Sequence, residues 1–205
     1  MSLEEEEKEL KKVEELAEEI KKMKSRLETR EKHHFYVQRK LEKELEKYFS
    51  ELFSEIKKYA PIICEKIEKI SGVKVNDEKA FMIIKEYFDS SIHVIIHEIA
   101  HSVLNEILGE KDPEKRLALS EILARFLERV VSSELMKEKP SRLITVESLE
   151  KQFEELQGYS VFRKTNFTVN DYKKLFEMFT AYLAEGKLKE NMGKIEKEIL
   201  SVLKL

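Results

Sequence analysis

Apolar side chains recur every three or four residues along much of this chain, which is the spacing of an amphipathic α-helix. One run covers about residues 77–109, with an interruption near residues 89–91, and a second covers about residues 113–138. Asp112 and Pro113 begin the second run, and a capping aspartate before a proline is a common helix start. The first run is defined by the apolar residues Phe81, Ile84, Phe88, Ile92, Ile95, Ile96, Ile99 and Val103.

The first 59 residues form a distinct segment, because residues 3–59 contain neither glycine nor proline. We expect a long N-terminal helical arm (1–59) that ends before Pro61, followed by a helical domain (60–205). In one heptad register, the d positions are mostly apolar: Val13, Ile20, Leu27, His34, Leu41 and Tyr48. The a positions are polar in the middle of the arm (Lys24, Glu31 and Gln38), which is atypical of a uniform dimeric coiled coil. We therefore interpret the arm as a long helix or a bent helical hairpin.

The remaining third also favours helices. Thr168 and Asp171 fit a capping box for a helix that ends near Gly186, and a final helix is expected over about 187–203. Short extended segments are predicted at Val73–Val75, at Arg142–Val146 and in a hairpin within Tyr159–Val169. The predicted fold class is therefore mainly α, with at most a small β-hairpin or minor sheet.

The amino-acid composition excludes several classes of protein and of site. The chain has 5 glycines and 3 prolines among 205 residues, too few for the many turns of a β-sandwich or barrel. Charged residues make up 39% of the chain, yet the net charge is only −3, which argues against a nucleic-acid-binding face. The single cysteine, Cys64, excludes an internal disulfide and a multi-cysteine metal site.

Cellular context is predicted from the same counts. The acidic N-terminus does not resemble a signal peptide, and no apolar run is long enough for a membrane span, so we expect a cytoplasmic protein with no membrane partner. An abundance of Glu and Lys with few Gln and Asn is typical of a heat-adapted source.

One motif in the chain has recognisable chemistry. His97-Glu98-Ile99-Ala100-His101 is an HExxH sequence inside a predicted helix. Histidines four residues apart lie on the same helix face, so their imidazole nitrogens can converge on one metal ion. The carboxylate of Glu98 can reach a water molecule beside that ion and act as a general base. A third ligand is expected from the next helix, and Glu121 is the natural candidate because that helix turns back after Gly109.

Over residues 97–125 the chain resembles the gluzincin zinc metallopeptidases, in which a glutamate on a downstream helix joins the two histidines. The resemblance implies Zn²⁺ held by His97, His101 and Glu121, with Glu98 as the general base and a peptide or protein as substrate. Members of that family usually have a β-sheet before the motif helix, whereas this sequence offers only Val73–Val75. They also use a Tyr or His to stabilise the reaction intermediate, and the candidates here are Tyr159, Tyr172 and Tyr182.

Two further residues lie close to this motif in the sequence. His93 is one turn before His97, but it is about 12 Å along the helix from His101, too far for both to bind one ion. It is therefore either a residue near the pocket or a surface residue. Arg125, one turn after Glu121, either holds that carboxylate or forms an ordinary ion pair.

Two alternative functions follow from other features. Glu31/His34 and Glu98/His101 are both ExxH pairs, as in ferritin-like di-iron bundles, with Glu65 or Glu68 as the preceding carboxylate. Against this, the acids before Glu31 lie on the same helical run, and His97 has no role. The other alternative is a non-catalytic helical interaction protein that assembles, as a homo-oligomer, through its N-terminal helix.

Overall fold

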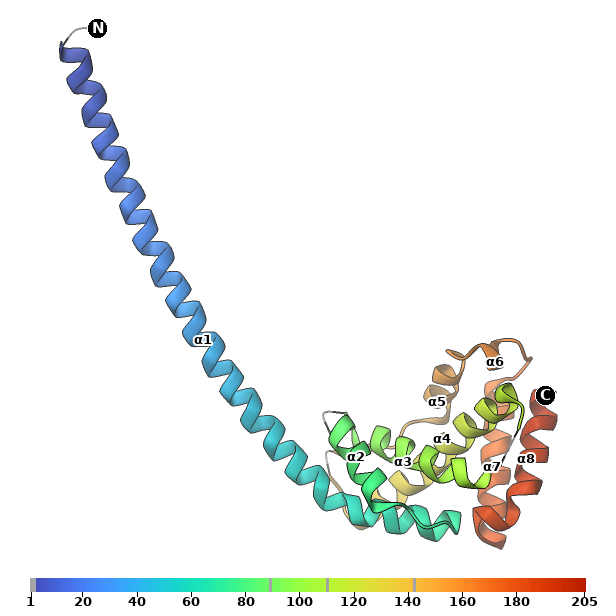
Figure 1. The fold of residues 1–205 in the computed structure, drawn as a ribbon. Helices are drawn as coiled ribbons and strands as arrows, with labels where there is room; N and C mark the ends of the chain where they lie inside the picture. Colours follow the sequence, from blue (N-terminus) through green and yellow to red (C-terminus); the bar gives the residue numbers. More distant parts are fainter. Residues whose placement is uncertain (1–2, 89, 110, 142) are drawn as a thin grey trace. The chain divides into compact units, whose positions relative to one another are not determined.

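A computed structural model describes residues 3–88, 90–109, 111–141 and 143–205, with the side chains of all of these except 3–17, 28, 30–35 and 45 (Figure 1). The described residues contain α-helices and no β-strand, so the mainly α fold class is confirmed. The extended segment predicted at Val73–Val75 and the hairpin predicted within Tyr159–Val169 are not present. Val73–Val75 is a loop without a ladder partner, and the predicted hairpin region contains the short helix α6 instead. The helices are α1 (Leu3–Ser71), α2 (Asp77–Tyr87), α3 (Ile92–Ile107), α4 (Pro113–Glu138), α5 (Leu149–Leu156), α6 (Ser160–Arg163), α7 (Val169–Glu185) and α8 (Leu188–Leu203).

The chain divides into an N-terminal unit, Met1–Glu51, and a C-terminal unit, Leu52–Leu205. The boundary predicted from sequence was residue 59, where Pro61 was expected to end the first helix. That end is wrong, because Pro61 lies inside α1. A proline in a helix interior costs about 3 kcal/mol. Here Ile56, Ile63 and Ile67 are fully buried around it, and burying each such side chain contributes about 1.5–3 kcal/mol. Burial therefore outweighs the proline.

Within the C-terminal unit, α3 and α4 make the most extensive helix contact (Figure 1). Gly109 follows the last turn of α3 with φ +63°, a left-handed conformation that glycine adopts without strain and that stops the helix. Asp112 then caps α4, since its side chain accepts hydrogen bonds from the backbone of Glu114 at 3.0 Å and Lys115 at 3.3 Å. The interruption predicted near residues 89–91 is confirmed as the break between α2 and α3.

Helix α4 lies between two groups of buried apolar side chains. One group joins the end of α1 to α2 and α3, and the other joins α4 to α7 and α8. The predicted capping box is present, because the Thr168 hydroxyl accepts from the Asp171 backbone N–H at 3.2 Å and the Asp171 carboxylate accepts from the Thr168 N–H at 3.0 Å. Because α4 has neighbours on both sides, its polar residues are buried as well as its apolar ones.

No helix within the described residues is both long enough and apolar enough to span a membrane.

Candidate metal centre

The HExxH motif lies on α3, where its apolar neighbours fix the helix against the core. Ile96, Ile99 and Ala100 are fully buried, and Ala100 belongs to the apolar group that contains α4. His97 and His101 lie beside Ala100 on α3, with their rings 4.6 Å apart between centroids. Their Nε2 atoms are 3.0 Å apart. The local helix geometry therefore brings the two imidazoles together as the spacing predicts.

Glu121 on α4 faces the same point. Its Oε2 atom lies 3.7 Å from Nε2 of His97, and its Oε1 atom lies 3.4 Å from Nε2 of His101. Glu121 is buried, with 7% of its surface exposed. His97, His101 and Glu121 form the group of potential metal ligands found among the described residues. The three side chains can hold a metal ion.

The spacing of these atoms fits a tetrahedral ion. Zinc with ligands at about 2.0–2.1 Å separates each pair of ligand atoms by about 3.3 Å. The two Nε2 atoms are 3.0 Å apart and Nε2 of His101 is 3.4 Å from Oε1 of Glu121, values on both sides of that separation, while the other carboxylate oxygen, Oε2, lies 3.7 Å from Nε2 of His97. Two polar atoms at the site also lack a hydrogen-bond partner although they are buried, namely Nδ1 of His97 and Oε2 of Glu121. A buried carboxylate oxygen without a donor is costly, and a cation beside it would remove that cost.

The protonation of the group favours metal binding. Burial lowers the pKa of His97 to about 4, helped by the nearby His101 and Arg125. His97 is therefore neutral near pH 7, the form in which imidazole binds metals. Burial alone would raise the pKa of Glu121, but the hydrogen bond and charge of His101 outweigh it and the pKa falls below its usual value. Glu121 is therefore an anion.

Two side chains on α4 orient the histidine rings. Ser120 Oγ lies 2.7 Å from Nδ1 of His101, and Glu128 Oε2 lies 3.5 Å from Nδ1 of His97. A proton on Nδ1 leaves Nε2 free for a metal, so the Ser120 contact favours the ligating tautomer of His101, while the Glu128 carboxylate lies beside Nδ1 of His97 without a hydrogen bond. Burial raises the pKa of Glu128 to about 7, and Gln152 donates a hydrogen bond to its Oε1 at 3.3 Å. Ser120 and Glu128 were not identified from sequence.

Replacing Glu128 by Gln is expected to weaken zinc binding about 10-fold or more, because a neutral amide supports the His97 ring less well than a carboxylate. The measurement is a zinc titration in competition with a chromophoric chelator. Glu134→Gln is the control: this half-buried residue of the same helix pairs with Lys66 away from the cleft, and its replacement should leave the dissociation constant for zinc unchanged. Equal affinity in Glu128→Gln and the parent protein would show that Glu128 does not support the site.

The ligands open onto a surface cleft that is formed within the C-terminal unit. Among its lining residues are His97, Glu98, His101, Glu121 and Tyr159. The structure distinguishes between the three tyrosine candidates. Tyr159 lines the cleft, and burial together with the charge of the nearby Glu121 raises the pKa of its hydroxyl. Tyr172 is fully buried with its hydroxyl 3.3 Å from Oε1 of Gln152, and Tyr182 is not among the residues that line the cleft.

The other candidate residues lie away from the cleft. His93 is not among the cleft residues, and its Nε2 lies 3.4 Å from Oε1 of Glu147 while its Nδ1 contacts Thr145 at 2.9 Å. The Arg125 guanidinium forms its ion pair with Glu155. It is therefore not the direct clamp on Glu121 that one interpretation of the sequence allowed.

The di-iron arrangement finds no support among the residues that can be described. Glu98 is beside the ligand group but is not a member of it. Glu65 is exposed, and Glu68 Oε1 accepts a hydrogen bond from the backbone of Val75 at 2.8 Å. The side chains of Glu31 and His34 lie outside the described residues.

No protein-family model, no curated protein and no solved structure matches this chain. Its chemistry must therefore be inferred from its own residues.

Proposed function

We propose that this protein is a zinc-dependent metallopeptidase similar to the gluzincins, with His97, His101 and Glu121 as the metal ligands. The observation on which the proposal rests is the convergence of three neutral or anionic donors from α3 and α4, whose ligand atoms all lie within 4.8 Å of one another. Two imidazoles and one carboxylate are the ligand set of many catalytic zinc sites. Such sites keep a fourth position for water or substrate, and the cleft beside these ligands leaves room for one.

Glu98 is the general base in this proposal. It is only partly buried, and it lines the same cleft as His97, His101 and Glu121. Zinc bound at this position would polarise a peptide carbonyl and lower the pKa of water to about 7. Glu98 would take the proton from the attacking water and pass it to the amine that leaves.

Tyr159 is placed to position the reacting group. Its raised pKa keeps the hydroxyl protonated at neutral pH, so it can donate a hydrogen bond into the cleft. The charge of Glu121 contributes to this raised pKa after burial, which indicates that Tyr159 lies near the ligand on α4. The substrate proposed is a peptide or protein segment.

Metal content is the first test. We expect the untagged full chain, stripped with a chelator and dialysed against zinc, to contain about one zinc ion per chain by mass spectrometry of the metal. His97→Ala should lose most of it, because two ligands cannot complete the site. His93→Ala removes the same side chain one turn earlier on α3 and should retain the zinc.

Either of two results would contradict the zinc proposal. Zinc content equal in His97→Ala and in the parent protein would place any bound metal elsewhere. Two iron ions per chain after reconstitution with iron would favour the di-iron bundle instead. In both cases far-UV circular dichroism of the variants shows whether the helices have been retained.

A further inference from the structure

The N-terminal unit presents a helix that has no packing of its own. Every described side chain of α1 from Glu18 to Glu51 is exposed. Helices in water obtain most of their stability from packing an amphipathic face, not from propensity alone. An exposed helix with an ordered apolar face is therefore a surface for another helix.

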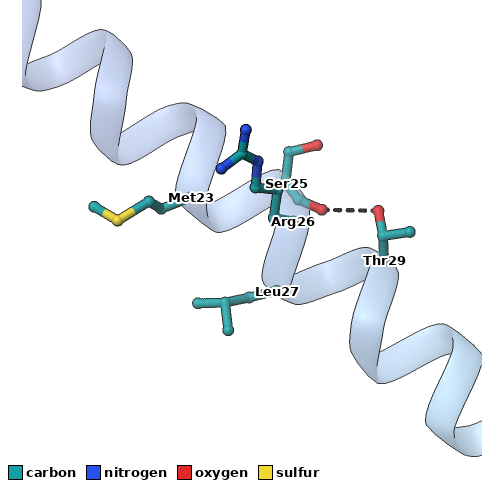
Figure 2. Close-up of a pocket in the computed structure, with 5 residues that line it drawn as sticks. All are labelled: Met23, Ser25, Arg26, Leu27 and Thr29. Atoms are coloured by element: carbon teal, nitrogen blue, oxygen red, sulfur yellow. Dashed lines mark hydrogen bonds between the residues drawn. The ribbon is translucent and has the colours of Figure 1, made fainter.

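The exposed apolar residues of this segment follow a seven-residue repeat. Ile20, Leu27, Leu41 and Tyr48 are spaced by multiples of seven, and each is 54–59% exposed. Met23 lies three residues after Ile20 and Val37 lies four residues before Leu41, and they are 55% and 50% exposed. Figure 2 shows Met23 and Leu27 projecting from one side of the helix, while Ser25 and Thr29 lie on the other. The apolar face is therefore continuous through this turn.

These residues define a second heptad register, which places more of the exposed apolar side chains at a and d than the register with Lys24, Glu31 and Gln38 at a. That register paired the Ile20 series with Lys24 and Gln38, which are polar. Moving the second set of positions back by one residue replaces these two by Met23 and Val37. Ile20, Leu27, Leu41 and Tyr48 then occupy a, and Met23 and Val37 occupy d. Arg30 and His34 of the sequence fall at d and a, and Glu44 falls at d, so the apolar contact is predicted in two blocks, 20–27 and 37–41, with Tyr48 as a further apolar a position after Glu44.

The charged residues at the e and g positions, beside the apolar face, indicate that the partner is a second copy of this chain. In a parallel, in-register pair, a g residue faces the e residue five positions later on the other helix. Glu19 is at g and Lys24 is at e, so Glu19 of one chain would face Lys24 of a second copy. The sequence repeats the relation with opposite sign one heptad later, at Arg26 and Glu31. Two-fold symmetry doubles both pairs and introduces no like-charge contact between them.

We propose that two copies of this chain associate through residues 19–48 of α1 as a parallel, in-register, two-stranded coiled coil. The block covers about 45 Å of helix. The proposal does not depend on the metal centre, because it concerns the N-terminal unit alone.

The test is the mass of the full chain in solution. Light scattering at about 20 µM should give twice the chain mass of 24.3 kDa. Leu27→Ser with Leu41→Ser should raise the dissociation constant of the dimer at least 100-fold, because two a positions lose their apolar contact on both helices. The control is Tyr36→Ser, which removes an exposed aromatic residue (68% exposed) at a c position and should leave the dimer intact. A monomeric parent protein, or a dimer unchanged by the Leu27/Leu41 variant, would overturn the proposal.

A second set of variants tests orientation without disturbing the apolar face. Glu19→Lys alone places like charges opposite Lys24 and should weaken the dimer about 3- to 10-fold at low salt. Adding Lys24→Glu in the same chain restores opposite charges and should recover the dimer. An antiparallel pair, or an arm folded onto the C-terminal unit of its own chain, would not show this recovery and would exclude the parallel arrangement.

Discussion

Glu98→Gln should reduce peptide hydrolysis by about 10²–10⁴-fold while the zinc content stays near one ion per chain. Glutamine has nearly the same shape as glutamate but cannot accept the proton of the attacking water. The metal is retained because Glu98 is beside the ligand group and not part of it. The measurement combines cleavage of a fluorogenic peptide library by the zinc-loaded protein with metal analysis of the same samples.

Glu106→Gln is the matched control for this experiment. Glu106 is on the same helix, α3, but it is exposed and is not among the residues that line the cleft. Its replacement should leave both the rate and the zinc content unchanged. If the parent protein cleaves no library member, peptide hydrolysis is contradicted even when zinc is bound. If Glu98→Gln cleaves as fast as the parent, the general base is another group.

Phe126→Ala should lower the free energy of unfolding of the C-terminal unit by about 3–5 kcal/mol, the largest effect expected from a change outside the cleft. The Phe126 ring is fully buried on α4, with ring-centroid distances of 5.0 Å to Tyr172, 5.2 Å to Phe176 and 5.3 Å to Phe179. Removing it leaves a cavity between α4 and α7. Urea unfolding followed by the near-ultraviolet circular dichroism of the tyrosines measures the change.

Phe81→Ala removes the same side chain from an exposed position on α2 and provides the comparison. Phe81 is 47% exposed, and its recorded ring contact is with the Lys57 ammonium, 5.8 Å from the ring centroid. The expected loss is about 1 kcal/mol or less. Similar losses from Phe81→Ala and Phe126→Ala would mean that the Phe126 contacts do not form the core in solution.

Local patterns in the sequence predicted most of the helices because helix formation depends on residues only a few positions apart. The caps at Asp112 and Thr168 and the break between α2 and α3 are signals of this kind. Pro61 is the instructive failure. Its local preference to end a helix is real, but buried isoleucines on both sides of it compensate, and that burial depends on other helices.

The residues around the three metal ligands, such as Glu128 and Tyr159, could likewise not be assigned from local patterns. Glu128 left a signal that could have been recognised, since polar residues at 121, 125, 128 and 132 form a stripe along the otherwise apolar helix α4. A stripe at this spacing marks one helix face. Periodicity does not show which neighbouring helix packs against that face of α4. It also does not show which of the three tyrosines, Tyr159, Tyr172 or Tyr182, lies in the cleft.

The sequence by itself determined that the chain is helical. It also determined that His97, Glu98 and His101 lie within about one turn of one helix, because both properties follow from the 3.6-residue period. The packing of α3 against α4 decided the rest. It brings Glu121 within 3.4 Å of His101 and Glu128 within 3.5 Å of His97, while the contacts of α4 with α5 and α6 bring Tyr159 to the cleft. These are contacts between residues about 20 to 60 positions apart, and they exist only because buried apolar faces of separate helices fit together.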